Sequence, residues 1–250
     1  MRADIQRMRA FAVGLVVVFH LSPHLIPGGY IGVDIFFVIS GYLITNHLFK
    51  EVKETGKLKL FRFWARRIRR LLPAAFTVLA VSAIVSIFLL PRSLLVQNLS
   101  EIGFASVYLL NWPLAANAVD YLGQNNAPSI AQHYWSLSVE EQFYFFWPLI
   151  FLVVIWIARW LKTRFAKALP IALVVVFFAS LAFSVFETSA SQPSAYFLTT
   201  TRAWEFALGG LVSLIPVLKV NRAAKSLMYG ISLSALLLTS LLFNSSSNFP

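Results

Sequence analysis

The stretch Pro73-Ala-Ala-Phe-Thr-Val-Leu-Ala-Val-Ser-Ala-Ile-Val-Ser-Ile-Phe-Leu-Leu90 decides the fold class of this chain. It contains no charged residue, and a helix that crosses a bilayer needs about 20 mostly apolar residues. Similar stretches lie at 5–22, 29–49, 136–158, 168–187 and 226–243, and a more polar one lies at 199–218. We therefore expect an all-α, polytopic transmembrane helical bundle with about seven spans.

The composition of the 250 residues supports a membrane protein. Hydrophobic residues make up 58% of the chain and charged residues 12%, whereas soluble domains carry about 45–50% and about 25%. With 23 Phe, 7 Trp and 8 Tyr, the chain is too aromatic for a disordered protein. It has no cysteine, which excludes disulfides, zinc–thiolate sites and thiol nucleophiles, and we expect no metal.

Positive charge flanks the apolar stretches and indicates their orientation. Most of the 21 Lys and Arg residues lie in four segments, 2–9, 50–70, 159–167 and 219–225. By the positive-inside rule these segments face the cytoplasm, which places the N-terminus inside. The crossings at 73–90 and 136–158 then suffice to connect the second segment to the third, so 94–112 is expected to be a re-entrant or interfacial helix on the outer side. Because topology explains the charge, we expect no nucleic-acid partner.

Two polar segments complete the topology. The Ser-rich stretch 188–195 is expected to be a plain outer loop. The chain ends with Asn244-Ser-Ser-Ser-Asn-Phe-Pro250, directly after the seventh span and without a charged tail. An odd number of spans with such an end predicts that the chain is truncated at its C-terminus.

Ionisable residues within spans are costly and usually functional. Arg9 and His20 are eleven residues apart, which is three helical turns plus about 20°, so they share one helix face. His20 is our candidate general base because imidazole titrates near neutrality. Asp34, near the outer end of the second span, is placed to orient or pair with it. The alternative is that Arg9 reaches the inner headgroups and His20 is a packing residue.

Later spans carry further candidates. Glu140 and Glu141 lie about one turn into the fourth span, and we expect Glu140 to face the bundle beside His20 while Glu141 is solvated. The alternative is an aromatic-rich anchor at the interface. Arg202 and Glu205, three residues apart, are predicted to form an intrahelical pair that contacts substrate or stabilises the bundle.

A basic and aromatic segment precedes the third span. It contains four arginines, Arg66, Arg67, Arg69 and Arg70. On a helix Arg67 shares a face with Arg70, as Arg66 does with Arg69, and such pairs can bind phosphates. They form our candidate site for a phosphate-bearing cytoplasmic cosubstrate. The alternative is an interfacial helix that binds anionic lipid.

Four motifs, in this order, resemble the acyltransferase family 3 integral membrane proteins. They are Arg9 and His20 with ten residues between them, Arg67-x-x-Arg70 before Leu71-x-Pro73, the segment Trp135 to Tyr144 with Glu140 at its Glu position, and Arg202-Ala-Trp-Glu205. The resemblance covers essentially all of residues 1–250. It is strongest for bacterial O-acetyltransferases that modify lipopolysaccharide O-antigen, peptidoglycan or exported polysaccharide.

The resemblance implies a multi-pass acyltransferase of the bacterial inner membrane. It would move an acyl group, expected to be acetyl, from cytoplasmic acetyl-CoA to a hydroxyl of a surface or lipid-linked glycan. Arg67 and Arg70, helped by Arg9, would bind the CoA phosphates. His20 would activate the acceptor or carry the acyl group, so that the two sites lie on opposite sides of the bilayer.

Two further expectations follow from the resemblance. Family members have more spans than this chain and often carry an extracytoplasmic SGNH domain, so the transmembrane domain at 1–250 is expected to be partial. Direct transfer and a covalent acyl-enzyme relay both remain open. The alternative function is a polytopic transporter with a proton or solute pathway through the ionisable residues Arg9, His20, Asp34 and Glu140.

Overall fold

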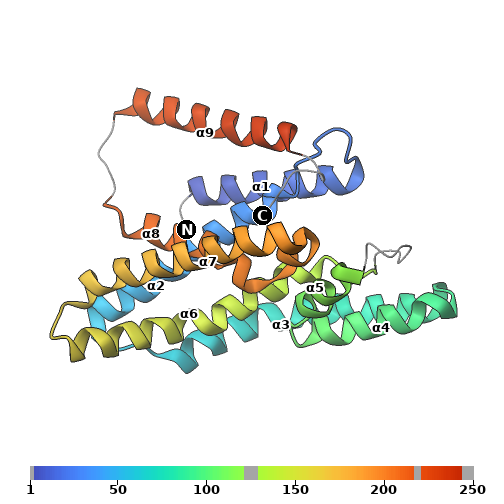
Figure 1. Ribbon diagram of the computed structural model, residues 1–250, viewed down its shortest axis with the longest axis horizontal. Helices are drawn as coiled ribbons and strands as arrows, with labels where there is room; N and C mark the ends of the chain where they lie inside the picture. The colour runs from blue at the N-terminus through green and yellow to red at the C-terminus, as the bar shows by residue number, and fades with distance from the viewer. Residues whose placement is uncertain (1–2, 121–128, 217–220, 244–250) are drawn as a thin grey trace. The chain divides into compact units, whose positions relative to one another are not determined.

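The protein is all-α in the computed structural model, which describes residues 3–120, 129–216 and 221–243 (Figure 1). No strand occurs in these residues. The helices are α1 (Ala3–Leu21), α2 (Ile31–Thr55), α3 (Leu60–Leu89), α4 (Arg92–Ser106), α5 (Asn111–Asp120), α6 (Tyr134–Trp160), α7 (Phe165–Phe197), α8 (Thr199–Leu214) and α9 (Arg222–Leu242). The predicted all-α class is confirmed.

Five of the described helices, α2, α3, α6, α7 and α9, are long and apolar enough to cross a bilayer. Their surfaces expose large apolar side chains, for example Phe88 at 80% and Trp160 at 73%, as a lipid-facing surface requires. α1 carries Asp4, Arg7 and Arg9 within its apolar length, and α8 has only 16 residues. The multi-pass membrane class is confirmed, while seven spans and an inner N-terminus stay predictions.

The basic segment and the apolar span after it form one continuous helix. α3 runs from Leu60 to Leu89 with Pro73 inside it. The segment at 61–73 is therefore neither a loop nor a separate interfacial helix. Its arginines lie on the same continuous helix as the span, and one of them, Arg67, reaches the neighbouring helix α6.

The outer loop predicted at 188–195 is wrong, because α7 continues to Phe197. Within it only Ser191 departs from helical geometry, with φ −155° and ψ 88°. Pro193 explains this kink: it lacks an N–H group, and its ring clashes with the carbonyl four residues earlier. The Ser- and Pro-containing stretch that predicted a loop therefore forms a kink within a helix.

The stretch 94–112 forms parts of two helices, α4 and α5, joined by a turn in which Tyr108 has a φ of 56°. α4 has 15 residues, fewer than the roughly 20 that a span requires. This agrees with the expectation that the stretch does not cross the bilayer. Its re-entrant or interfacial placement stays a prediction.

Two compact units make up the chain. The first is built from Met1–Asn46 and Glu205–Asn248, and the second from His47–Trp204. Both α2 and α8 contribute residues to each unit.

Close contact between backbones holds the first unit together. A Cβ at Gly32 of α2 would lie 2.5 Å from the carbonyl oxygen of Ala12 in α1. At Gly41 a Cβ would overlap the backbone of Phe206 in α8, while the Phe206 ring stacks on Phe37 at 4.9 Å. Only glycine permits such approach, so these residues serve helix packing.

In the second unit, α6 supplies the core and a polar network. Trp147 is fully buried. Nε2 of Gln142 donates to the Tyr108 carbonyl and to Oδ1 of Asn111, both at 2.7 Å. The Thr199 hydroxyl donates to Oε1 of Gln142 at 2.7 Å. This network ties α6 to α5 and to the start of α8, and it fixes the rotation of α6 next to its two glutamates.

Candidate functional site

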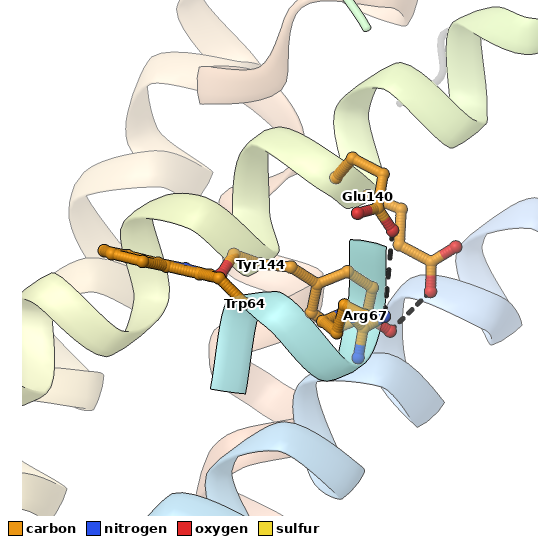
Figure 2. A network of polar contacts seen from close by, with 5 residues as sticks. Trp64, Arg67, Glu140 and Tyr144 are labelled. Carbon is orange, nitrogen blue, oxygen red and sulfur yellow. Dashed lines mark hydrogen bonds and ion pairs between the residues drawn. The ribbon is translucent and has the colours of Figure 1, made fainter. Parts of the chain in front are cut away.

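A charged cluster joins α3 and α6 in the second unit (Figure 2). The guanidinium carbon of Arg67 lies 3.0 Å from the centroid of the Tyr144 ring, and its Nη2 lies 3.7 Å from Oε1 of Glu141. The Tyr144 hydroxyl donates to Oε1 of Glu140 at 2.6 Å. Nε1 of Trp64 donates to the Tyr144 carbonyl at 3.3 Å. One tyrosine therefore positions an arginine, a carboxylate and an indole.

Helical spacing explains this arrangement. Glu140 and Glu141 precede Tyr144 by four and three residues, so both carboxylates lie one turn from its ring. A cation over an aromatic face gains about 0.5–2 kcal/mol, more where water is excluded. The side chains of Arg67 and Glu141 are only 27% and 16% exposed. The cluster therefore holds charge in a partly dehydrated place.

Several buried polar atoms around the cluster lack hydrogen-bond partners within the described part of the chain. They are Nε of Arg67, Oε1 of Glu141, Oγ of Ser138 and the hydroxyl of Tyr108. Ser138 precedes Glu141 by three residues and so lies on the same side of α6. A buried unpaired group costs about 1–3 kcal/mol, so a polar molecule that pairs with these atoms would be stabilised here.

Tyr108 precedes α5 and has an altered acidity. Burial raises the pKa of its phenol above the ordinary value, and the negative charge of Glu141 adds to the rise. A phenol is already protonated near neutral pH, and this shift extends the pH range over which Tyr108 is a hydrogen-bond donor. Sequence reasoning passed over Tyr108, because no pattern in residues 94–112 marks it.

Glu141 is the glutamate whose role was misjudged from the sequence. It was expected to be solvated, whereas its side chain is largely buried and paired with Arg67. Glu140, the residue expected to face the bundle, accepts the hydrogen bond from Tyr144. The prediction failed because the sequence does not specify how α6 is rotated toward α3.

Arg67, the residue predicted to bind the donor, lies close to Glu140, which was expected beside His20. Tyr144 contacts both residues. The Tyr134 hydroxyl donates to the Ala75 carbonyl at 3.2 Å, while Trp64, earlier on α3, reaches Tyr144, later on α6. The two helices are therefore antiparallel, and the basic first part of α3 lies beside the glutamates.

The other arginines of α3 point elsewhere. Nη2 of Arg66 lies 3.2 Å from Nε2 of His47 on α2, so His47 accepts this hydrogen bond. Nε of Arg69 donates to the carbonyl four residues earlier at 3.2 Å. Arg70 is exposed. Because the segment is helical, Arg67 and Arg70 do share a side of α3, but only Arg67 is held against α6.

The first unit carries the other three predicted site residues. Nδ1 of His20 lies 2.7 Å from the Val16 carbonyl. A carbonyl can only accept, so Nδ1 bears the proton and the basic lone pair is on Nε2. Arg9 lies on the same helix, and Asp34 lies in the first turn of α2; both are partly buried. Orientation of His20 by Asp34 or Glu140 stays a prediction.

Arg202 and Glu205 are buried in α8, with 1% and 0% exposure. Nε of Arg202 donates to the Tyr196 carbonyl at 3.2 Å, and its guanidinium carbon lies 4.8 Å from the Tyr196 ring centroid. It also lies 5.9 Å from the ring centroid of Trp135. Arg202 is therefore enclosed by aromatic side chains, while the predicted pair with Glu205 stays a prediction.

No group of three or more His, Asp or Glu side chains within residues 3–120, 129–216 and 221–243 is arranged to hold a metal ion.

The family model for the acyltransferase domain called Acyl_transf_3 matches residues 2–249. The chain belongs to this family. It is 37% identical over 208 residues to the putative peptidoglycan O-acetyltransferase YrhL of Bacillus subtilis, covering 83% of this chain and 32% of that protein. It is 38% identical over 208 residues to the peptidoglycan O-acetyltransferase OatA of Listeria monocytogenes, covering 82% and 32%.

A third relative is the putative O-acetyltransferase SACOL0978 of Staphylococcus aureus, 35% identical over 208 residues, with 83% of this chain and 34% of that protein covered. The chain thus spans about a third of the length of these curated relatives, 32–34%. No solved structure matches it. The family predicted from the four motifs is confirmed.

Proposed function

We propose that this protein acts as a membrane-bound O-acetyltransferase of the bacterial cell envelope. It moves an acetyl group from acetyl-CoA, at the cytoplasmic face of the inner membrane, to a hydroxyl of a surface or lipid-linked glycan. The observation that carries the proposal is the family match over residues 2–249. Relatives named as peptidoglycan O-acetyltransferases favour peptidoglycan over O-antigen or exported polysaccharide.

Arg67 is the proposed centre of the donor site. It carries a positive charge in a partly dehydrated place, and its Nε has no hydrogen-bond partner in the described chain. An anionic phosphate oxygen of CoA would accept from Nε and gain from the low polarity around it. The exposed Arg66, Arg69 and Arg70 on the same helix add long-range attraction, and Arg9 assists.

His20 is the proposed general base. Because Nδ1 donates to the Val16 carbonyl, Nε2 is the atom that takes the proton of the acceptor hydroxyl. The hydroxyl oxygen then bonds to the acetyl carbon while the thioester C–S bond breaks, and the proton passes to the leaving thiolate. Asp34 or Glu140 would tune His20. An SGNH domain in the full-length protein would be a partner on the outer side.

The proposal is tested by mass spectrometry of cell-wall glycan from the host with and without the gene, and with a His20→Ala variant. Loss of O-acetyl groups is expected in the deletion strain and in His20→Ala, with membrane insertion intact. His24→Ala is the matched control, since this imidazole is exposed in the turn that follows α1. Unchanged acetylation in the deletion strain would overturn the function. Unchanged acetylation in His20→Ala alone would overturn its catalytic role.

A further inference from the structure

A crevice of about 280 Å³ opens between the end of α6 and the start of α7 in the second unit. Its walls are apolar side chains of both helices, among them Val154, Ile157 and Ile171. Lys167 and Thr163 supply polar groups to its lining. The volume lies below the roughly 300–1,000 Å³ of drug-sized sites, and the lining offers almost nothing to a polar ligand. The crevice suits a single hydrocarbon chain.

Four basic residues lie at the connection between α6 and α7, and Lys167 among them lines the crevice. They are Arg159 at the end of α6, Lys162 and Arg164 between the helices, and Lys167 in the first turn of α7. All four side chains are exposed, and within the described residues none of them forms a hydrogen bond or ion pair. The charge of this connection is therefore not neutralised by a described part of the protein.

The start of α7 makes this charge more unfavourable. Lys167 lies in the first turn of α7. Arg164 is the N-cap residue of this helix, and its side chain makes no capping hydrogen bond. The N-terminus of a helix already carries positive partial charge and unpaired N–H groups, so cations are disfavoured there and anions are favoured. An anionic group beside this turn would relieve the repulsion and accept from the helix N–H groups.

We propose that this crevice binds one anionic phospholipid. One acyl chain fills the apolar crevice between α6 and α7, and the phosphate of the headgroup contacts Lys167 and Arg164. Both helices are long and apolar enough to lie in a bilayer, so lipid chains are the medium that reaches the crevice. Trp156 and Trp160 are 67% and 73% exposed on the last turns of α6, as is typical of side chains at the level of lipid headgroups.

Trp156 and Trp160 adjoin the crevice-lining residues Ile157 and Leu161 in the sequence, so their fluorescence reports on lipid close to the site. The full chain is reconstituted into vesicles of equal parts phosphatidylglycerol and phosphatidylcholine, with bromine on the acyl chains of only one lipid at a time. Bromine quenches tryptophan fluorescence on contact, and the composition is the same in both samples. Brominated phosphatidylglycerol is expected to quench at least twofold more than brominated phosphatidylcholine. A Trp156→Phe/Trp160→Phe variant should lose this difference.

Variants separate the site from general surface charge. Lys167→Gln and Arg164→Gln should bring the two lipids to equal quenching, and Ala172→Phe, which fills the crevice, should lower quenching by both. Lys225→Gln on α9 removes an equivalent exposed charge and should change nothing. Equal quenching by both lipids in the unaltered protein would overturn the proposal. So would an equal loss in Lys225→Gln and Lys167→Gln. If the Ala172→Phe protein does not insert into the membrane, the Lys167→Gln variant still tests the proposal, because the Lys167 side chain is exposed and its replacement leaves the packing intact.

Discussion

Arg67 and Arg202 lie in the same unit, and both place a guanidinium against a tyrosine ring, yet the structure treats them differently. Arg202 is 1% exposed, and its Nε is bonded to the Tyr196 carbonyl. The Arg67 side chain is 27% exposed, and its Nε has no partner among the described residues. A buried and bonded arginine is part of the scaffold. The Arg67 guanidinium lies against the Tyr144 ring with its buried Nε unbonded, while the rest of the side chain stays partly exposed, so Arg67 is the better candidate to meet a ligand.

The largest effect should come from removing the scaffold arginine. Arg202→Ala is expected to destabilise the protein by about 3 kcal/mol, because a hydrogen bond to a charged group contributes about 1.5–3 kcal/mol and the ring contacts add to it. The measurement is the thermal midpoint of the detergent-solubilised protein, together with its level in membranes. A midpoint unchanged from the unaltered protein would show that Arg202 is not structural.

Arg67→Ala should have a smaller effect on folding and a distinct effect on activity. Membrane level should stay the same, while kcat/KM for acetyl-CoA falls about tenfold, which corresponds to about 1.4 kcal/mol of lost donor binding. Steady-state kinetics with varied acetyl-CoA provides the test. If instead only the membrane level falls, the segment is a lipid anchor and the contrast with Arg202 fails.

Glu141→Gln tests the comparison of Arg67 with Arg202 by changing the carboxylate that pairs with Arg67. Glu141 competes with an anionic ligand for Arg67, so its neutral amide should lower the KM for acetyl-CoA by about threefold, which corresponds to about 0.7 kcal/mol. Glu54→Gln is the matched control, because this carboxylate is exposed on α2 and has no role in the cluster. A higher KM in Glu141→Gln would mean that Glu141 positions Arg67 and does not compete for it.

The smallest effect is expected for Tyr144→Phe. This variant keeps the ring under Arg67 and loses only the hydrogen bond to Glu140, which corresponds to about 0.5–1.5 kcal/mol of stability. Tyr144→Leu, which also removes the ring face, should raise the KM for acetyl-CoA as Arg67→Ala does. Equal kinetics in the two variants would show that the ring does not hold the guanidinium.

Local sequence patterns predicted the all-α membrane class of this protein and its family. They did not predict how the helices are rotated and shifted against one another. Hydropathy identified the membrane helices, because apolar length is a property of each segment alone. Which of Glu140 and Glu141 faces Arg67 depends on how α6 is rotated and shifted against the antiparallel α3. The Ser- and Pro-containing stretch before Phe197 was likewise misjudged, since α7 continues through it with only a kink at Ser191.

The shared tyrosine has a consequence for charge. Two carboxylates lie within reach of a single arginine, and in a medium of low polarity such groups tend to collapse into a tight, neutral pair. The ring of Tyr144 takes up the face of the guanidinium, and its hydroxyl occupies one oxygen of Glu140 (Figure 2). Glu141 is left at 3.7 Å, too far for a hydrogen bond. Tyr144 thus holds Arg67 with its ring and Glu140 with its hydroxyl, which leaves Glu141 as the carboxylate that forms the loose ion pair with Arg67.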